Sequence, residues 1–365
     1  MAELINQLSD AAIDLLIKLI KTPSFSREEA ETATLIQDFL AEHGVAAQRR
    51  QNNVWAISQH CDAAKPTILL NSHHDTVKPG AGWQYDPFGA TLEGDKLTGL
   101  GSNDAGASAV SLLAVFLYIQ NQDNPFNLIC AITAEEEISG ANGIRSVLPE
   151  FGRIDLGIVG EPTGMNLAIA EKGLIVLDCT AHGRTGHAAR EEGENALYKA
   201  LDDIEWLRGF QFPKVSPLLG PVKTTVTQIS AGTQHNVVPD RCQFVVDVRT
   251  NELYQNQEIV DFLRDKMQSE IVPRSTHLNS SRISENHPII KKGVAMSKTI
   301  YGSPTLSDQS MMPFETLKMG PGESARSHTP DEFILLSEIR AGIRDYIELL
   351  TGAQGLAGFK EVSQS

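Results

Sequence analysis

The chain has 365 residues, of which 41% are hydrophobic and 21% are charged, so it can bury a large core and is long enough for two domains. Its formal net charge is −15, and no run of Lys or Arg supplies the basic face on which nucleic acid would bind. These properties exclude nucleic acid as an expected partner.

The N-terminal stretch predicts an amphipathic helix. Glu3, Asp10 and Asp14 interrupt its apolar residues, whereas a secretory signal would keep an unbroken apolar core. No segment of the sequence reaches the roughly 18 continuous apolar residues that cross a membrane. The four cysteines lie far apart and form no Cys-x-x-Cys pair, which favours free thiols. We therefore expect a cytoplasmic protein that has no membrane partner.

Helices and short apolar strands alternate in the first part of the chain. A helix over 5–20 is followed by a second over 28–43, where Ser26 and Glu29 have the spacing of a capping box. A further helix is expected over 105–120. The strands are expected at 54–58, 67–71, 126–134 and 155–159. This alternation predicts an α/β fold in which helices flank a mostly parallel sheet.

The order of elements changes after about residue 172. The next elements are expected in the order β-α-β-β-α-β, at 174–181, 195–207, 224–229, 241–249, 258–269 and 275–283. That order is typical of a small ferredoxin-like α+β sandwich. A helix-rich segment resumes near 286 and ends in a helix over 336–350. We therefore expect a large domain of residues 1–172 and 286–365, with a smaller domain of residues 173–285 inserted into it.

A polar cluster ends the apolar strand at 67–71, at the edge where parallel sheets hold their sites. Side chains two residues apart in a strand face the same way, so His73 and Asp75 can cooperate while His74 points elsewhere. An aspartate behind a metal-bound imidazole orients the ring and raises its basicity. Taken alone, the His-x-Asp triplet is a weak signal that is more typical of polar residues on the surface than of a metal site.

A glycine-rich loop, Gly99–Gly106, opens the helix over 105–120 and contains Asp104. Such a loop can cradle a phosphate, but this one fits neither the dinucleotide fingerprint nor the P-loop, and it has no phosphate-binding lysine. Asp104 suits a carboxylate that bridges two cations. A cap of the following helix is the other interpretation that the segment allows.

Further acidic residues follow other predicted strands. Glu135, Glu136 and Glu137 come directly after the strand at 126–134, and three carboxylates there are costly unless a cation or a proton compensates them. A solvated charge run is the alternative. Glu161 ends a second strand, and His328 lies in a late segment. Mixed His, Asp and Glu ligands suit zinc or a similar borderline cation.

With these segments in hand, the chain resembles the co-catalytic di-zinc deacylases and exopeptidases. That family includes acetylornithine deacetylase, succinyl-diaminopimelate desuccinylase, aminoacylase and carboxypeptidase G. The segments occur in the family's order, and the likeness covers nearly the whole chain. Their spacing is most similar to that of acetylornithine deacetylase.

The resemblance implies two zinc ions per subunit, with Co²⁺ or Mn²⁺ able to substitute. The implied ligands are His73, Asp104, Glu137, Glu161 and His328. The two histidines would bind different ions, and Asp104 would bridge the pair. Glu137 would complete the shell of one ion and Glu161 that of the other. Asp75 would orient His73, and Glu136 would act as general base and then as general acid.

The inserted domain resembles the family's lid or dimerisation domain, which implies a homodimer formed through it. His187 matches a histidine that stabilises the oxyanion, often in the site of the partner subunit. Asn236 and Arg249 match residues that hold the carboxylate of the substrate. From the residues alone, His187 is also consistent with a surface histidine and Arg249 with an ion pair at a strand end.

The chain departs from the family pattern at four places. Ala105–Ala107 replaces the usual Met-Lys-Gly, and Glu135 stands where aspartate is usual. Ala188 and Ala189 replace serines after the lid histidine, and Thr305–Asp308 replaces Gly-Thr-Ser-Asp. None of these changes removes a ligand. The last two bear on which substrate is selected.

These features predict a zinc-dependent amidohydrolase with a small N-acyl amino acid as its substrate. Acetyl- or succinyl-ornithine or -citrulline, in arginine biosynthesis, is the expected substrate class. Succinyl-diaminopimelate desuccinylation and dipeptide hydrolysis are the alternatives. A metal-free binding protein on the same fold is a reading from another class, but such a protein would have lost ligands or the base. A nucleotide-binding protein would need the lysine that the Gly99–Gly106 loop lacks.

Overall fold

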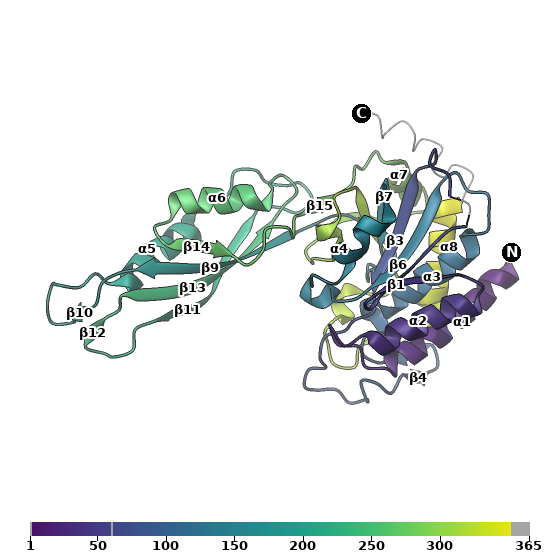
Figure 1. Ribbon diagram of the computed structural model, residues 1–365, viewed down its shortest axis with the longest axis horizontal. Helices are drawn as coiled ribbons and strands as arrows, with labels where there is room; N and C mark the ends of the chain where they lie inside the picture. Colours follow the sequence, from purple (N-terminus) through teal and green to yellow (C-terminus); the bar gives the residue numbers. More distant parts are fainter. Residues whose placement is uncertain (1, 60, 352–365) are drawn as a thin grey trace. The chain divides into compact units, whose positions relative to one another are not determined.

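The structure of this protein, a computed structural model, describes residues 2–59 and 61–351. The chain divides into two compact units (Figure 1). The first unit is formed by Met1–Ile169, Ile283–Tyr301 and Ser307–Ser365, and the second by Ala170–Arg282 and Gly302–Leu306. The second unit is thus inserted in the chain of the first. It also takes in the short segment Gly302–Leu306, which no local pattern in the sequence indicated.

The first unit is built on a sheet whose central strands run parallel (Figure 1). The strand order is β1-β2-β6-β3-β7-β17-β8-β15, and β16 also pairs with β8. Neighbours among β6, β3, β7 and β17 are parallel, whereas β2 and β8 join this centre as antiparallel strands. The bounds are β1 (Gln48–Arg50), β2 (Asn53–Ile57), β3 (Thr67–His73), β6 (Asn127–Thr133), β7 (Leu156–Val159), β8 (Leu167–Glu171), β15 (Ser281–Arg282), β16 (Ile300–Ser303) and β17 (Thr316–Lys318).

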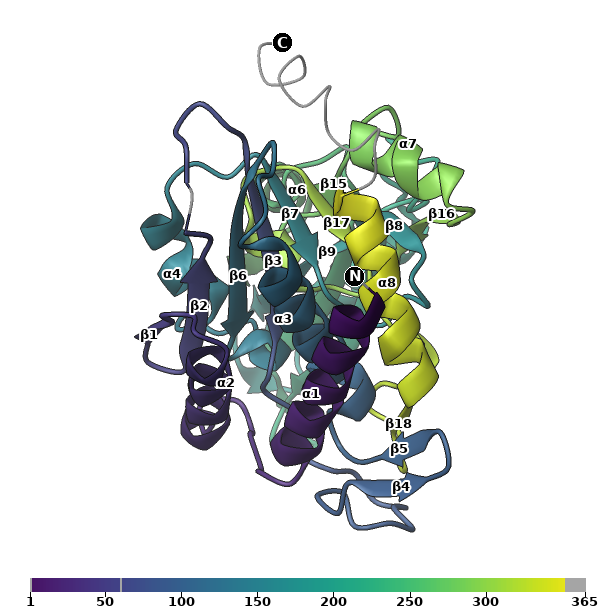
Figure 2. The ribbon, with the colours of Figure 1, turned by 90° about the vertical axis from the view of Figure 1, so that its right-hand side faces the viewer.

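Helices cover both faces of this sheet, as the alternation predicted. Three of them, α1 (Ala2–Ile20), α3 (Ala107–Ile119) and α8 (Leu336–Thr351), pack together on one face (Figure 2). On the other face, the short helix α4 (Ile144–Val147) packs against Trp55 and its apolar neighbours. The remaining helices of the unit are α2 (Ala30–Glu42) and α7 (Pro288–Ala295). The expected α/β fold with a mostly parallel sheet is therefore confirmed.

The central helix α3 is apolar because it is enclosed on all sides. Every one of its residues is buried. By length and composition alone, the window Ser102–Ile119 could cross a membrane, but 94% of that window is buried inside the structure. Its composition is therefore explained by its place between the sheet and the neighbouring helices.

The expected capping box of the second helix is wrong. Helix α2 begins at Ala30, and Glu29, the residue before it, makes no side-chain capping bond. The Ser26 hydroxyl instead donates to a carboxylate oxygen of Asp75 at 2.7 Å. In a capping box the serine oxygen would accept a backbone N–H, whereas here the hydroxyl donates to a carboxylate, a type of bond that is strong when the carboxylate is ionised, so a long-range contact replaces the local one. Ser26 thereby becomes part of the surroundings of the candidate site.

The second unit has the β-α-β-β-α-β order that the sequence predicted. Its elements are β9 (Gly173–His182), α5 (Ala196–Gly209), β11 (Lys223–Ala231), β13 (Arg241–Thr250), α6 (Asn256–Lys266) and β14 (Glu270–Pro273). The strands form an antiparallel sheet in the order β11-β13-β9-β14, as in a ferredoxin-like sandwich. The strands β10 (Gly186–His187) and β12 (Val237–Val238), which are distant in the sequence, pair antiparallel as a separate two-stranded sheet of the unit, the β10–β12 sheet.

The last strand of this order is misplaced in the sequence prediction. We expected it over 275–283, but β14 covers Glu270–Pro273, and most of 275–283 is irregular apart from β15. Only Ile271 is buried in β14, so this short edge strand carries almost no apolar pattern. Three strands outside the large sheets form a small sheet of the first unit, β4 (Thr91–Glu93), β5 (Lys96–Thr98) and β18 (Phe333–Leu335).

Candidate metal centre

The five predicted ligands converge at one edge of the sheet of the first unit. His73 is the last residue of β3 and pairs with Thr133, the last residue of the parallel strand β6. Glu137 follows β6, and Glu161 follows β7, which is parallel to β3 on its other side. Parallel neighbours end at the same edge, so the polar residues that follow them are brought together.

Asp104 lies between the two histidines. Its Oδ1 atom is 3.3 Å from His73 Nε2, and its Oδ2 atom is 3.6 Å from His328 Nε2. Glu161 Oε1 lies 3.6 Å from His73 Nε2, whereas Glu137 Oε2 lies 3.0 Å from His328 Nε2. The five residues therefore form two groups that share Asp104, and one carboxylate oxygen of Asp104 faces each histidine.

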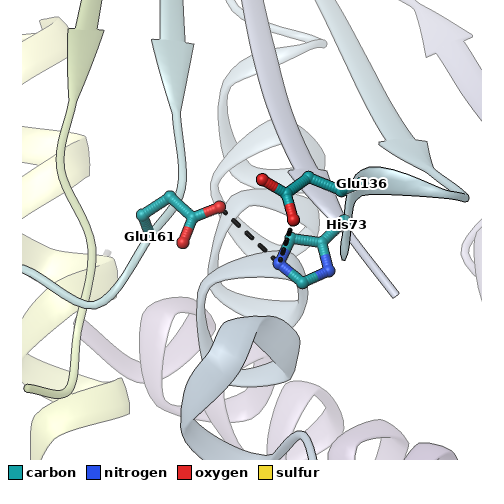
Figure 3. Close-up of side chains that lie close together, drawn as sticks. All are labelled: His73, Glu136 and Glu161. Carbon is teal, nitrogen blue, oxygen red and sulfur yellow. Dashed lines mark ion pairs between the residues drawn. The ribbon is translucent and has the colours of Figure 1, made fainter. Parts of the chain in front are cut away.

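Glu136 and Glu161 approach the same imidazole nitrogen (Figure 3). Glu136 Oε2 is 3.7 Å from His73 Nε2, and the Glu136 side chain is only 12% exposed. The short turn η2 (Glu136–Ile138) sends the side chains of Glu136 and Glu137 to different histidines. Glu135, before this turn, points away instead and accepts hydrogen bonds from the Asn142 backbone and side chain.

Asp75 holds both the first histidine and the acidic turn. The His73 ring faces Asp75 through Nδ1, which lies 3.0 Å from the backbone oxygen and 3.5 Å from the carboxylate. The same carboxylate accepts hydrogen bonds from the backbone N–H groups of Glu136 and Glu137, at 3.0 and 3.2 Å, and from Ser26. Sequence reasoning placed Asp75 behind His73 but missed these other partners, because they come from distant segments.

His74 faces away from this centre, as the strand alternation predicted. Its Nδ1 atom is 2.8 Å from the Thr32 hydroxyl, and its Nε2 atom is 2.9 Å from the Asn52 carbonyl oxygen. Burial lowers the pKa of His74 to about 4, so the ring is neutral at physiological pH. Its hydrogen bonds make it a structural residue beneath the site.

The centre concentrates buried negative charge. Burial raises the pKa of Glu161 to about 8, and the nearby charge of Asp104 adds to this effect. Burial also raises the pKa of Glu136. Burial alone would lower the pKa of His73, but the nearby carboxylates of Glu136, Asp104 and Asp75 outweigh it, so that pKa is raised. The hydrogen bond with Glu137 raises the pKa of His328 to about 9.

These side chains fit a pair of divalent cations. Among the described residues, His73 Nε2 and Glu161 Oε1 are buried atoms that have no hydrogen-bond partner. His73 Nδ1 faces a carbonyl oxygen, which can only accept, so the proton belongs on Nδ1 and Nε2 presents its lone pair to the centre. A cation there would give both atoms a partner and offset the carboxylate charge. The mixed nitrogen and oxygen donors suit zinc or a similar ion.

The loop that suggested a phosphate site uses its N–H groups internally. The backbone N–H groups of Gly101, Asn103 and Asp104 donate to the carboxylate of Glu332. A phosphate would need such donors free, and its charge would be repelled by the carboxylate that occupies them. This arrangement argues against the nucleotide-binding reading. Glu332 was inside a segment that the sequence singled out, but no local signal shows that its side chain is buried.

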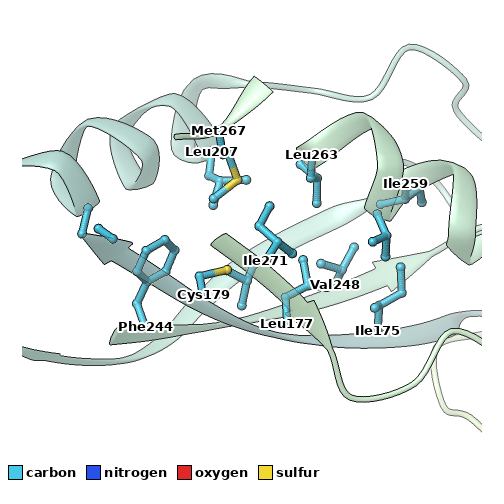
Figure 4. Close-up of a cluster of buried hydrophobic side chains, with 14 of the residues drawn as sticks. Ile175, Leu177, Cys179, Leu207, Phe244, Val248, Ile259, Leu263, Met267 and Ile271 are labelled. Carbon is cyan, nitrogen blue, oxygen red and sulfur yellow. The ribbon is translucent and has the colours of Figure 1, made fainter. Parts of the chain in front are cut away.

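The predicted lid residues belong to the second unit, which has its own hydrophobic core between its sheet and its helices (Figure 4). His187, in the β10–β12 sheet, and Asn236, just before β12, are exposed neighbours. The Ala188 N–H donates to the Asn236 carbonyl oxygen at 3.0 Å. His187 Nδ1 accepts a hydrogen bond from the Ala189 N–H, so Nε2 carries the proton of the neutral ring.

Arg249 lies in β13 of the four-stranded sheet, at the end of that sheet away from the β10–β12 sheet. In the pairing of β13 with β9, Arg241 is opposite His182 and Arg249 is opposite Leu174. The eight steps along β13 from Arg241 to Arg249 span roughly 27 Å at about 3.4 Å per residue. Strand β9 begins beside Arg249 and ends beside Arg241, and the β10–β12 sheet with His187 follows the Arg241 end. The Arg249 guanidinium forms two hydrogen bonds with the carboxylate of Asp247, the ion pair that the sequence left open.

Known proteins resemble this chain in sequence and in fold. The sequence profile described as peptidase family M20/M25/M40 matches residues 69–351. A succinyl-diaminopimelate desuccinylase 2 of Ruegeria sp. is 28% identical over 271 residues, which cover 69% of this chain and 68% of that protein. An M20 domain-containing protein of Schizosaccharomyces pombe is 26% identical over 352 residues, covering 92% and 83%. The YXEP protein of Bacillus subtilis, a dinuclear metal-binding peptidase of the M20 family, shares the fold with a TM-score of 0.71 at 15% identity, over 94% of this chain and 98% of its own.

Proposed function

This chain belongs to peptidase family M20/M25/M40, as the resemblance predicted, and on that premise we propose that it hydrolyses the amide bond of an N-acyl amino acid with two zinc ions. Membership makes it a metal-dependent hydrolase. The observation that carries the finer proposal is the position of Asp104, which turns one carboxylate oxygen toward each histidine. A bridging ligand between two ions requires that arrangement.

The distances suggest how the ligands divide between the ions. His73 and Glu161 would hold one ion, His328 and Glu137 the other, and Asp104 would bridge both. When bound, such a pair supplies a Lewis acid for the amide carbonyl and activates water at neutral pH.

The remaining chemistry comes from side chains of this chain. Glu136 would remove the proton from the attacking water and deliver it to the leaving nitrogen. Its carboxylate is held beside the ligands by the hydrogen bond from its own N–H to Asp75. His187 Nε2–H would donate to the developing oxyanion, and Asn236 and Arg249 would hold the α-carboxylate of the substrate, so that the scissile bond is positioned before reaction.

We propose that His187 and Arg249 of one chain act on different substrate molecules. The steps of β13 from Arg241 to Arg249 alone span roughly 27 Å, and the β10–β12 sheet that carries His187 follows the Arg241 end, whereas an extended N-acyl amino acid spans roughly 12 Å. A homodimer would allow both residues to act on one substrate, because each site could receive Arg249 from one subunit and His187 from the other. We therefore place His187 and Asn236 in the site of the partner subunit.

Different observations favour two kinds of N-acyl amino acid as the substrate. Acetyl- or succinyl-ornithine or -citrulline fits the motif spacing and the glutamate at position 161, which is similar to that of the deacylase branch. Succinyl-diaminopimelate is favoured by the relative from Ruegeria sp., whose name states that activity. Both are N-acyl amino acids that carry an α-carboxylate for Asn236 and Arg249 to hold.

A direct comparison of substrates tests the proposal. The purified protein is stripped of metal, loaded with zinc, cobalt or manganese, and assayed side by side with the acetyl and succinyl derivatives, succinyl-diaminopimelate and a dipeptide. We expect zinc-dependent release of the amine from at least one acyl amino acid. Turnover of the dipeptide alone would refute the deacylase assignment and leave a peptidase, whereas turnover without metal would refute the metal centre.

A further inference from the structure

Two buried polar side chains that the reaction does not use, Glu332 and Asn103, join the segments that carry Asp104 and His328. One segment is the loop at 101–104, which follows β5, and the other is the stretch at 323–332, which precedes β18, the strand that pairs with β5. What these residues could do depends on the proposed metal ligands, so this inference rests on the proposed function.

Glu332 holds the loop from one side. Its side chain is 2% exposed. Its Oε1 atom accepts the N–H groups of Asn103 and Asp104 at 2.8 and 2.9 Å, and its Oε2 atom accepts the N–H group of Gly101 at 3.1 Å. Three N–H donors on the two oxygens of one buried side chain fix the backbone at the residue that presents the bridging oxygens.

Asn103 holds the other segment to the same loop. Its amide nitrogen donates to the Glu323 carbonyl oxygen at 3.1 Å and to the Ser327 hydroxyl at 3.3 Å, and its amide oxygen accepts the Glu323 N–H at 3.0 Å. Gly322 comes so close that an added Cβ would lie 2.3 Å from the amide oxygen of Asn103. The contact is therefore built into the backbone of both segments.

The stretch that carries His328 is held by hydrogen bonds on both sides of the histidine. The His328 side chain is 53% exposed, unlike the buried imidazole of His73. Asn103 fixes this stretch before the histidine, at Glu323 and Ser327, and Glu332 fixes it after the histidine. Both anchors end on the loop of Asp104, so the two ligands move together.

We propose that Glu332 and Asn103 are positioning residues for the metal ion that His328 binds. They keep the bridging carboxylate at the distance from that histidine that one ion requires. Neither residue touches the substrate or the ion. Partners of this kind typically change metal affinity or activity by about 10- to 100-fold.

The test measures zinc affinity rather than turnover alone. Glu332→Gln keeps the volume but replaces one acceptor oxygen with an amide that faces an N–H donor. We expect one of the two zinc ions, the one that His328 binds, to bind about 10- to 100-fold less tightly. Competition with a chromophoric chelator measures both affinities. We also expect kcat at limiting zinc to fall and excess zinc to restore it, with KM unchanged.

Asp203→Asn is the matched control. Asp203 is also a buried carboxylate, 4% exposed, and it accepts two backbone N–H groups and a hydroxyl, all from Gln268 and Ser269 in the second unit. This control should lower the melting temperature and leave both zinc affinities unchanged. If Glu332→Gln behaves in the same way, the positioning role is overturned.

Asn103→Ala keeps the test decisive if Glu332→Gln fails to fold, because it removes the anchor on the other segment and predicts the same weakening of one ion. A wild-type protein that binds fewer than two zinc ions would refute the ligand assignment of the proposed function. A wild-type protein that binds two, together with folded variants that bind them equally well, would refute this inference alone.

Discussion

The predicted catalytic machinery occupies two regions of different character. In the first unit, most of its side chains are buried near the ends of parallel strands, with His73 1% and Asp104 13% exposed, although His328 is 53% exposed, and hydrogen bonds fix the buried ones in place. In the second unit, His187 and Asn236 are exposed at the β10–β12 sheet, and the Arg249 side chain is 36% exposed. The buried group is preorganised around its ligands before any substrate arrives. The exposed group can contribute only when a substrate or a partner subunit orders it, so the two regions are expected to fail differently on mutation.

The largest effect is expected for the general base in the buried region. Glu136→Gln should lower kcat by about 10²- to 10⁴-fold, because the amide cannot take the proton of water. Zinc content should stay near two per chain, as measured by elemental analysis, because the proposed ligand set does not include Glu136. Glu150→Gln, at an exposed ion pair with Arg50, is the control. Full turnover by the Glu136 variant would remove that residue from the mechanism.

The next largest effect is expected for His187 in the exposed β10–β12 sheet. His187→Ala should lower kcat by about 10²- to 10³-fold, the loss typical of one oxyanion donor, without changing zinc affinity. When it is coexpressed with Glu136→Gln under separate tags, mixed dimers should regain activity. In these dimers, one site has an intact base and receives an intact histidine from the partner. Mixed dimers that stay as inactive as either parent would place His187 in its own subunit's site.

A smaller effect should follow from loosening the support of the buried group. Ser26→Ala removes the hydroxyl that donates to Asp75, and we expect kcat to fall by about tenfold while the protein stays folded. Thr34→Ala is a suitable control, because its hydroxyl bonds the carbonyl of Ala30 on an exposed face of α2. Equal kcat values for the two variants would show that Asp75 needs no support from Ser26.

The smallest effect on turnover is expected at His74, which instead governs stability against acid. Its pKa is about 4 in the fold and about 6.5 when unfolded, so the unfolded state binds more protons between these values. Stability should therefore fall as the pH drops from about 6.5 to 4, by about 3 kcal/mol from this residue. Urea unfolding of His74→Gln across that range should be less steep in pH. An unchanged slope would mean that the ring is not held neutral.

Much of the fold could be predicted because its signals are local. The strands β3, β6 and β7 are mainly apolar, and a polar residue of the candidate site lies at the end of each strand or a few residues after it, as His73 does at the end of β3. Where the pattern weakens, the prediction failed. Glu270–Pro273 buries one residue and was missed, and the capping box at Ser26 was displaced by a carboxylate 49 positions away.

Local periodicity and motif order were enough to determine the two-unit architecture, the parallel sheet and the family, because strand ends and their polar residues are written in adjacent letters. Only the tertiary structure decided that Glu161 accompanies His73 and Glu137 accompanies His328, and that Asp75 and Glu332 hold backbone groups from distant segments. It also decided that His187 and Arg249 lie in different sheets of the second unit. Those relations depend on the direction of side chains and the register of strands, which are set by packing over the whole chain.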